Sequence, residues 1–271
     1  MSEALDRIAA ALERLAPPAG PTADWMAAPA YVWNGSARPV DRIVAPALAL
    51  LRGIDAQKTV VTSNVARLAA GHAAHDMLLW GARGMGKSAL LRASVAAAQA
   101  ADPAQLALVQ VAPEALATLN GLFAMLGQQS RRFLVFIDDL GFEDGDSAGP
   151  RALRSWLEGG VEARPGNVRL AVTSNRRAIV ARHLDEQDDP INPRDVIDDR
   201  LALADRFGLS VGFHNCTQDD YLAIIAGYCA ELQLDFAAPD ALEWAKRRGA
   251  RSGRIAWHYV TEIAGRAGRT L

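Results

Sequence analysis

The 271-residue sequence has only two cysteines, Cys216 and Cys229, and no apolar run approaching the length that crosses a membrane. Two cysteines are too few for a disulfide framework, which favours a reducing compartment. The N-terminal segment carries Glu3, Asp6 and Glu13 where a secretory signal needs a basic start and an apolar stretch. We therefore expect a cytoplasmic protein without membrane contacts.

A large net charge is also missing, since the formal charge is −2 at neutral pH. This near-neutral balance argues against a protein whose whole surface binds nucleic acid. Charge is nevertheless distributed unevenly along the sequence, because residues 241–271 are rich in Lys and Arg and residues 185–199 are rich in Asp and Glu. The basic segment indicates either a nucleic-acid surface or, as we favour, a helical surface whose arginines serve a ligand and subunit contacts.

Glycine is not scarce, and three of the 22 glycines lie within a single eight-residue motif. Residues 81–88 fit the pattern G-x-x-x-x-G-K-[ST], directly after apolar residues 77–80 and before a helical pattern. Such a loop turns backbone N–H groups toward an anion, and the following helix adds the positive end of its dipole. The alternative is a glycine-rich turn that only bends the chain. We expect a nucleotide-phosphate site at Gly81, Ala82, Arg83, Gly84, Met85, Gly86, Lys87, Ser88 and Ala89.

Within this loop, Lys87 is expected to reach the β- and γ-phosphates and Ser88 to hold Mg²⁺. A second part of the site follows the apolar run 133–137, which is typical of a buried parallel strand and ends in Asp138 and Asp139. Carboxylates at the end of such a strand face the crevice where α/β sheets bind ligands. Asp138 is then a second Mg²⁺ ligand and Asp139 the residue that orients water, although acidic strand ends are often only solvated.

Three further polar residues fit the same site. Asn175 follows the predicted strand 168–173 and is placed to contact the γ-phosphate or water, or merely to cap the next segment. Arg206 precedes the predicted strand 209–213 and would act on a neighbouring subunit's γ-phosphate. Arg254 opens the last predicted helix, where it would fold back onto nucleotide. Each arginine alone is more often a solvated or salt-bridged side chain.

The order of these parts resembles that of the AAA+ ATPases. Several phrases are also similar to a bacterial family of predicted ATPases catalogued as domain of unknown function 815. The phrases are residues 79–84, 157–165, 173–177, 205–209 and 251–257.

The resemblance implies roles for individual positions. By this resemblance, residues 81–88 correspond to Walker A, and Asp138 and Asp139 correspond to Walker B. Asn175 corresponds to sensor 1, Arg206 to the arginine finger and Arg254 to sensor 2. Residues 53–58, including Ile54, fall where AAA+ proteins embrace the adenine, although an ordinary helix start would look the same.

One departure concerns Asp139, since most AAA+ proteins have Glu there. The side chain is one methylene shorter, which would leave a water-mediated base, recruit Glu143 instead, or slow hydrolysis. A displacement of about 1 Å can cost on the order of 100-fold in rate.

The predicted fold is α/β: a P-loop core with a five-stranded parallel sheet between helices, followed by a small helical lid. Residues 1–50 form an N-terminal helix, a Pro/Ala-rich linker and a hairpin signalled by Asn34-Gly35; residues 51–213 form the core and residues 214–271 the lid. A capping box at Thr217 and Asp220 opens the first lid helix.

The sequence therefore predicts a homo-oligomer that binds ATP in an Mg²⁺-dependent way. We expect it to be an ATPase that controls the assembly or remodelling of an unidentified protein partner. The alternatives are an ATP-bound switch or a nucleic-acid loader with little turnover. A P-loop kinase fits less well, because it does not explain Asn175, Arg206 and Arg254.

Overall fold

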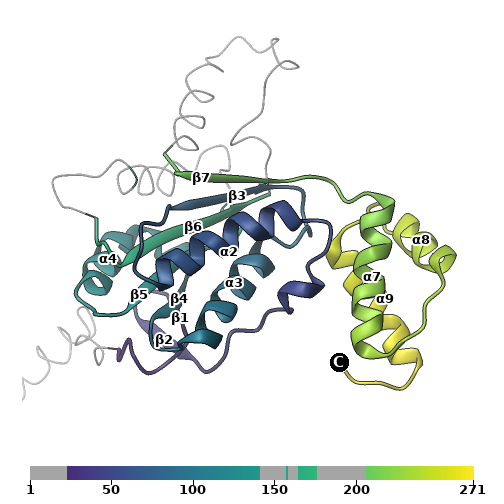
Figure 1. The fold of residues 1–271 in the computed structure, drawn as a ribbon, viewed down its shortest axis with the longest axis horizontal. Coiled ribbons are helices and arrows are strands. Elements are labelled where there is room, and N and C mark those ends of the chain that lie inside the picture. Colours follow the sequence, from purple (N-terminus) through teal and green to yellow (C-terminus); the bar gives the residue numbers. More distant parts are fainter. Residues whose placement is uncertain (1–22, 141–156, 158–163, 176–205) are drawn as a thin grey trace, which may run out of the picture.

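The computed structural model describes residues 23–140, 157, 164–175 and 206–271, and a seven-stranded sheet lies at its centre (Figure 1). The strand order is β2-β1-β4-β5-β6-β3-β7, and every neighbouring pair is parallel except β1 and β2. The strands are β1 (Ala30–Trp33), β2 (Ala37–Val40), β3 (Met77–Gly81), β4 (Leu106–Val111), β5 (Arg132–Ile137), β6 (Val168–Ser174) and β7 (Leu209–Phe213).

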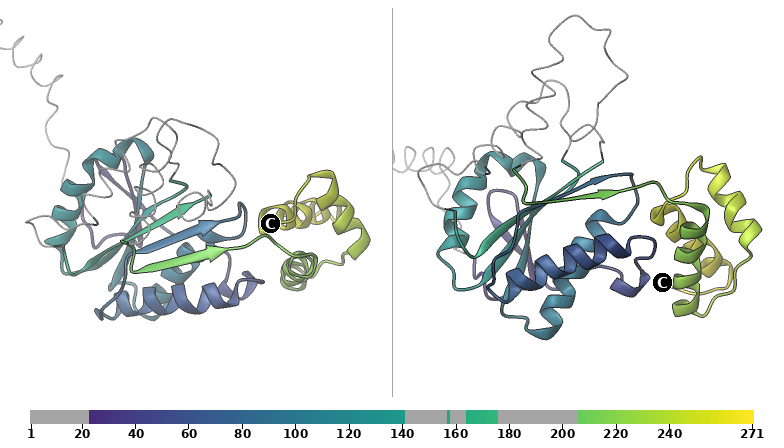
Figure 2. Two further views of the ribbon diagram at one scale, coloured as in Figure 1. Left: turned by 90° about the horizontal axis from the view of Figure 1, so that it is seen from above. Right: turned by 45° about the horizontal axis from the view of Figure 1, so that its top comes forward.

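Helices cover both faces of this sheet (Figures 1 and 2). On one face lie α2 (Asp55–Ala69) and α3 (Lys87–Ala101), and on the other lie η2 (Pro113–Thr118) and α4 (Leu119–Gly127). Apart from Arg132 at the start of β5, the central strands β3 and β5 consist of apolar residues and glycine, as expected for strands buried on both faces. The α/β arrangement predicted from the sequence is therefore confirmed.

The number of strands differs from the expected five, because the Asn34-Gly35 hairpin adds β1 and β2 to the edge of the sheet. Strand β1 pairs in parallel with β4, with Tyr31 opposite Val109. The indole N–H of Trp33 also donates to the Thr118 hydroxyl at 2.8 Å. Aromatic side chains in β1 are buried there, so the hairpin gains apolar contacts that it would lack as a separate extension.

Residues just before the hairpin also pack on the core. The Trp25 ring lies 4.8 Å from that of Tyr31 and 5.7 Å from that of Phe133, measured between centroids. Arg131 is buried and donates to the carbonyls of Trp25 and Ala28 at 2.9 and 2.7 Å. The guanidinium thereby satisfies backbone acceptors that this buried segment would otherwise leave unpaired.

A bundle of three helices follows the last strand: α7 (Gln218–Leu232), α8 (Ala238–Arg247) and α9 (Gly253–Arg266), standing beside one end of the sheet (Figures 1 and 2). The predicted capping box is present, since the Thr217 hydroxyl accepts from the Asp220 N–H while the Asp220 carboxylate accepts from the Thr217 N–H. A short helix, η1 (Leu48–Leu50), packs between the sheet domain and α7. Among the described residues, every helix is too short or too polar to cross a lipid bilayer.

Some sequence predictions fall outside the described residues. They are the helix over residues 2–15, the acidic run 185–199 and the alternative base Glu143.

Candidate functional site

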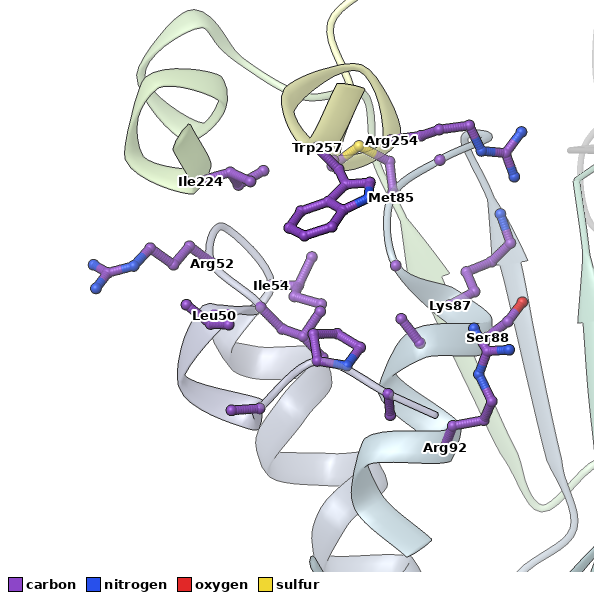
Figure 3. Close-up of a pocket in the computed structure, with 18 of the residues that line it drawn as sticks. Leu50, Arg52, Ile54, Met85, Lys87, Ser88, Arg92, Ile224, Arg254 and Trp257 are labelled. Atoms are coloured by element: carbon purple, nitrogen blue, oxygen red, sulfur yellow. The ribbon is translucent and has the colours of Figure 1, made fainter. Parts of the chain in front are cut away.

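A cavity of about 740 Å³ opens where the strand ends of the sheet meet the helical bundle (Figure 3). One part of its lining is polar or charged and the other is apolar. The polar part includes Lys87, Ser88, Arg92, Asp138, Asp139, Thr173, Asn175 and Arg254. The apolar part includes Val44, Pro46, Leu50, Leu51, Ile54, Met85, Ile224, Tyr228 and Trp257.

The glycine-rich loop follows β3 and enters α3, as the sequence predicts, and its shape requires glycine. Gly81 has φ 116°, and a Cβ there would lie 2.2 Å from the carbonyl oxygen of Phe213 in β7. Gly84 has φ 72°, and a Cβ there would lie 2.8 Å from the hydroxyl oxygen of Ser252. Glycine therefore permits both the turn and the close approach of neighbouring segments.

Lys87 lies at the start of α3, where its ammonium is held inside the loop. Its Nζ donates to the carbonyls of Gly81 at 2.9 Å and Ala82 at 2.8 Å, and to the Asn175 Oδ1 at 3.0 Å. Burial lowers the pKa of Lys87; the carboxylates of Asp139 and Asp138 oppose this shift. The like charges of Arg83 and Arg254 lower the same pKa further, so several cations converge where an anion would be stabilised.

Ser88 and Asp138 form the next pair. The Ser88 hydroxyl donates to Asp138 Oδ1 at 2.6 Å, and the Thr173 hydroxyl donates to the same oxygen at 2.7 Å. A hydroxyl and a carboxylate beside a phosphate loop are oxygen ligands of the kind Mg²⁺ takes. Within the described ranges no cluster of three or more His, Cys, Asp or Glu forms a self-sufficient metal site. The residues thus fit a magnesium ion that draws its other ligands from phosphates and water.

Asp139 and Asn175 are joined directly. The Asn175 Nδ2 donates to Asp139 Oδ1, while the Asp139 backbone N–H donates to the Thr173 hydroxyl at 2.8 Å. Asp139 has φ 50°, a left-handed conformation that is uncommon for a residue other than glycine. Such conformations concentrate at functional sites, where surrounding contacts hold them in place.

The start of α9 docks on the phosphate loop. The Arg254 N–H donates to the Gly84 carbonyl at 3.2 Å, and Ser252 caps the helix by accepting from the Ile255 N–H at 3.2 Å. Figure 3 shows the Arg254 side chain reaching the same side of the cavity as Lys87. The helical bundle therefore supplies one cation to the wall opposite the sheet.

Arg206 lies elsewhere. It comes just before β7 and lines a separate cavity of about 320 Å³ with Asp76, Arg164 and Arg169, at the end of the sheet where the strands begin. The phosphate loop follows the other end of β3, and a strand of five residues spans about 16 Å. Arg206 is therefore not brought together with Lys87 within this chain.

The structure also locates the other residues that the sequence predicts for nucleotide binding. Ile54, at 4% exposure, and Ala89 line the main cavity, with Ile54 directly before α2. Ala82 contributes its carbonyl to Lys87, whereas the Arg83 side chain is exposed.

Sequence reasoning missed several residues of the cavity. The sequence pattern places Thr173 only within a strand and Arg92 only within a helix. A signal existed for Arg92, because it lies four residues after Ser88 and therefore on the same helix face. The wall formed by Val44 to Leu51 and the indole of Trp257 had no local signal.

The basic C-terminal segment is largely engaged within the chain. Arg247 and Arg266 pair with Glu243 and Glu262, each four residues earlier on its helix. Two others also have neighbours: the Arg248 guanidinium lies 3.4 Å from the centre of the Trp244 ring, and Arg269 donates to the Leu232 carbonyl. These contacts are made within the helical bundle, and the choice between a helical surface that serves a ligand and subunit contacts and a nucleic-acid surface stays a prediction.

Comparisons with solved structures identify the fold as AAA+. The RuvB Holliday junction branch migration motor of Thermotoga maritima aligns with a TM-score of 0.54 and 17% identity, covering 82% of this chain and 66% of that chain. The ORC1 protein of Aeropyrum pernix, solved in complex with DNA, aligns with a TM-score of 0.56 and 17% identity, covering 80% of this chain and 61% of that chain. This chain thus spans less than two thirds of either neighbour. No curated protein matches the sequence.

The sequence model of one family matches nearly the whole chain. That family is described as "Protein of unknown function (DUF815)", and the match covers residues 26–267. It includes the hairpin, the phosphate loop, the acidic strand and all three helices of the bundle. The chain therefore belongs to the DUF815 family and has an AAA+ fold.

Proposed function

We propose that this protein binds Mg·ATP in the cavity between its sheet and its helical lid, and that it hydrolyses ATP to control the assembly or remodelling of a protein partner. The observation that carries the proposal is that charged and polar side chains from separate segments line the same cavity. Lys87, the Ser88–Asp138 pair, the Asp139–Asn175 pair and Arg254 come from separate segments and line one cavity. Together they offer what phosphoryl transfer requires: cations, oxygen ligands for a metal and a group to position water.

In this proposal Lys87 exchanges its carbonyl partners for the β- and γ-phosphate oxygens. Ser88 and Asp138 would hold Mg²⁺, which would neutralise phosphate charge when bound. The Thr173 hydroxyl keeps Asp138 in place through the shared Oδ1. Arg254 adds a positive charge from the lid, so nucleotide occupancy favours the docked position of α9 on the phosphate loop.

Asp139 positions and deprotonates the attacking water in the proposed reaction. Its carboxylate is oriented by Asn175, whose amide also contacts Lys87 and thus spans from the base to the phosphate-binding cation. Proton transfer to a positioned carboxylate contributes typically ~10²–10⁴-fold to a rate. The shorter reach of Asp relative to Glu makes us expect slow turnover.

Arg206 completes the site of a neighbouring subunit. It lies at the opposite end of the sheet from the phosphate loop of its own subunit, so head-to-tail packing would bring it to the next nucleotide. An arginine supplied in this way is worth ~10³–10⁵ in turnover in other phosphoryl-transfer proteins. The proposed active form is consequently a homo-oligomer.

The test is phosphate release from Mg·ATP as a function of protein concentration, with equilibrium ATP binding measured alongside. We expect the rate per subunit to rise with concentration, and to be lost in Lys87→Ala and in Arg206→Ala while Arg206→Ala still binds ATP. Arg38→Ala in the hairpin is the matched control for loss of a surface arginine. ATP binding without phosphate release above the Lys87→Ala background would contradict hydrolysis.

A second candidate is a switch or nucleic-acid loader that binds ATP with little turnover. The position of Asp139 favours it, because its carboxylate is already bonded to Asn175 and is one methylene shorter than the usual Glu. One structural neighbour is described as a Holliday junction branch migration motor and the other was solved in complex with DNA, which is consistent with a loader. A switch or loader would bind Mg·ATP tightly and release phosphate at a negligible rate. Its binding to a partner or to nucleic acid would nevertheless change when Mg·ATP is bound.

A further inference from the structure

We propose that the indole of Trp257 is the stacking surface for the purine base of the bound nucleotide. This inference rests on the proposed function, because it assumes that the phosphates of the same molecule lie on the glycine-rich loop. The inference concerns recognition of the base, which residues that bind only phosphates cannot provide.

Trp257 presents an apolar ring to the cavity. Its side chain remains 38% exposed, and Val44, which is 70% exposed, lines the same cavity. Large apolar surfaces left open within a lined cavity are typical of sites that a ligand covers. Figure 3 shows the indole extending from α9 into the space above Ile54 and beside Met85.

The indole is also held in orientation. The ring of Tyr228 in α7 lies 4.9 Å from the Trp257 ring, centroid to centroid, with the planes at 58°. This tilted packing holds the indole against α7, and both rings line the cavity. A ring fixed before binding loses little conformational entropy when a base stacks on it.

The position of Trp257 relative to the glycine-rich loop suits a nucleotide. Trp257 lies three residues after Arg254, so both project from neighbouring places on α9, with Arg254 on the charged side. On the opposite wall, Ile54 lies close to the loop, since a Cβ at Gly86 would be 3.6 Å from its Cδ1. A bicyclic base between Trp257 and Ile54 would thus remain next to its own phosphates.

The experiment compares binding of ATP and of inorganic tripolyphosphate, which has the phosphates without the base. Wild type should bind ATP more tightly than tripolyphosphate. Trp257→Ala should weaken ATP binding by about 5- to 100-fold and leave tripolyphosphate binding unchanged, because base stacking on an aromatic ring is worth ~1–3 kcal/mol. Trp257→Phe should retain most of the ATP affinity.

Intrinsic fluorescence gives a readout independent of turnover. Addition of ADP should change the tryptophan emission of wild type and of the control Trp244→Phe, whose ring packs on Tyr259 within the lid, but not that of Trp257→Phe. Equal ATP affinity of wild type and Trp257→Ala would overturn the inference, and so would an equal loss of ATP and tripolyphosphate binding. Failure of wild type to bind ATP at all would instead overturn the proposed function.

Discussion

The Nζ of Lys87 lies 3.0 Å from the Oδ1 of Asn175, and the other end of that amide donates to Asp139. The Asn175 side chain, directly after β6, therefore connects Lys87, the proposed phosphate-binding lysine, to Asp139, the proposed base. Such an arrangement makes the position of Asp139 dependent on what Lys87 contacts.

The first prediction concerns Asn175→Ala. We expect turnover to fall by about 10-fold or more, since Asp139 loses the donor that orients it, while ATP affinity changes by less than about 3-fold. Asn34→Ala, in the hairpin turn, is the control and should leave both values unchanged. Steady-state phosphate release and equilibrium binding separate the two effects, and a large loss of affinity with normal turnover would contradict the assigned role.

Gly84 provides a test of the contact between the phosphate loop and the lid. Gly84→Ala introduces a methyl group 2.8 Å from the Ser252 hydroxyl, whereas Gly249→Ala, at a nearly equal φ of 70°, meets nothing within 4 Å. Both variants carry the cost of a left-handed alanine, which is about 1 kcal/mol. Only Gly84→Ala should also weaken nucleotide binding and increase proteolysis of the lid; equal behaviour of the two would show that the contact is unimportant.

A third prediction concerns stability at the opposite end of the sheet. Asp76 is buried, accepts from the Leu170 N–H at 2.8 Å and pairs with Arg164 at 2.8 Å. Asp76→Ala removes the acceptor of that N–H and the carboxylate that Arg164 contacts, which should lower the free energy of unfolding by about 1–3 kcal/mol. The exposed pair of Glu243 and Arg247 is the control, and Glu243→Ala should cost less than about 0.5 kcal/mol in the same denaturant titration.

Alkaline pH should destabilise the lid through Cys216. Burial, followed by the nearby charge of Asp220, raises the pKa of this thiol from 9.0 to about 11. A raised folded-state pKa means that the stabilising contribution is complete below pH 9 and is lost as the pH rises toward 11, because the unfolded state loses its proton first.

The size of this loss should be on the order of 2 kcal/mol. Denaturant titrations of wild type and Cys216→Ala at pH 8, 9, 10 and 11 measure it, and the variant should lose less stability over this window. A parallel decline of both proteins would contradict the prediction. Tyr221 acts in the same direction at higher pH, since burial raises its pKa to about 12.

Much of the site could be predicted because its chemistry depends on local sequence. The glycine pattern around Lys87 specifies a loop shape, and the apolar run before Asp138 specifies a buried strand whose end faces the crevice. Asn175 follows from the same reasoning, since parallel strands bring their ends to one edge of the sheet. These features need no knowledge of distant contacts.

Other features depend on contacts between distant segments. The place of β1 beside β4 is decided by burial of Tyr31 and by the carbonyls that Arg131 satisfies, more than one hundred residues from Trp25. The Asn-Gly turn predicted the hairpin but not its partner strand. The approach of Ser252 to Gly84 and of Trp257 to the Ile54 wall likewise arises only when the lid packs on the core.

The most direct measurement is phosphate release from a mixture of Lys87→Ala and Arg206→Ala. Each variant alone should be inactive, the first because it lacks the phosphate-binding lysine and the second because it lacks the arginine of the neighbouring site. In the mixture, Arg206 of a Lys87→Ala subunit can complete the ATP site of an Arg206→Ala subunit, so activity should return to a substantial fraction of wild type. A mixture no more active than the sum of its parts, with Arg206→Ala alone hydrolysing ATP like wild type, would contradict an ATPase site shared between subunits.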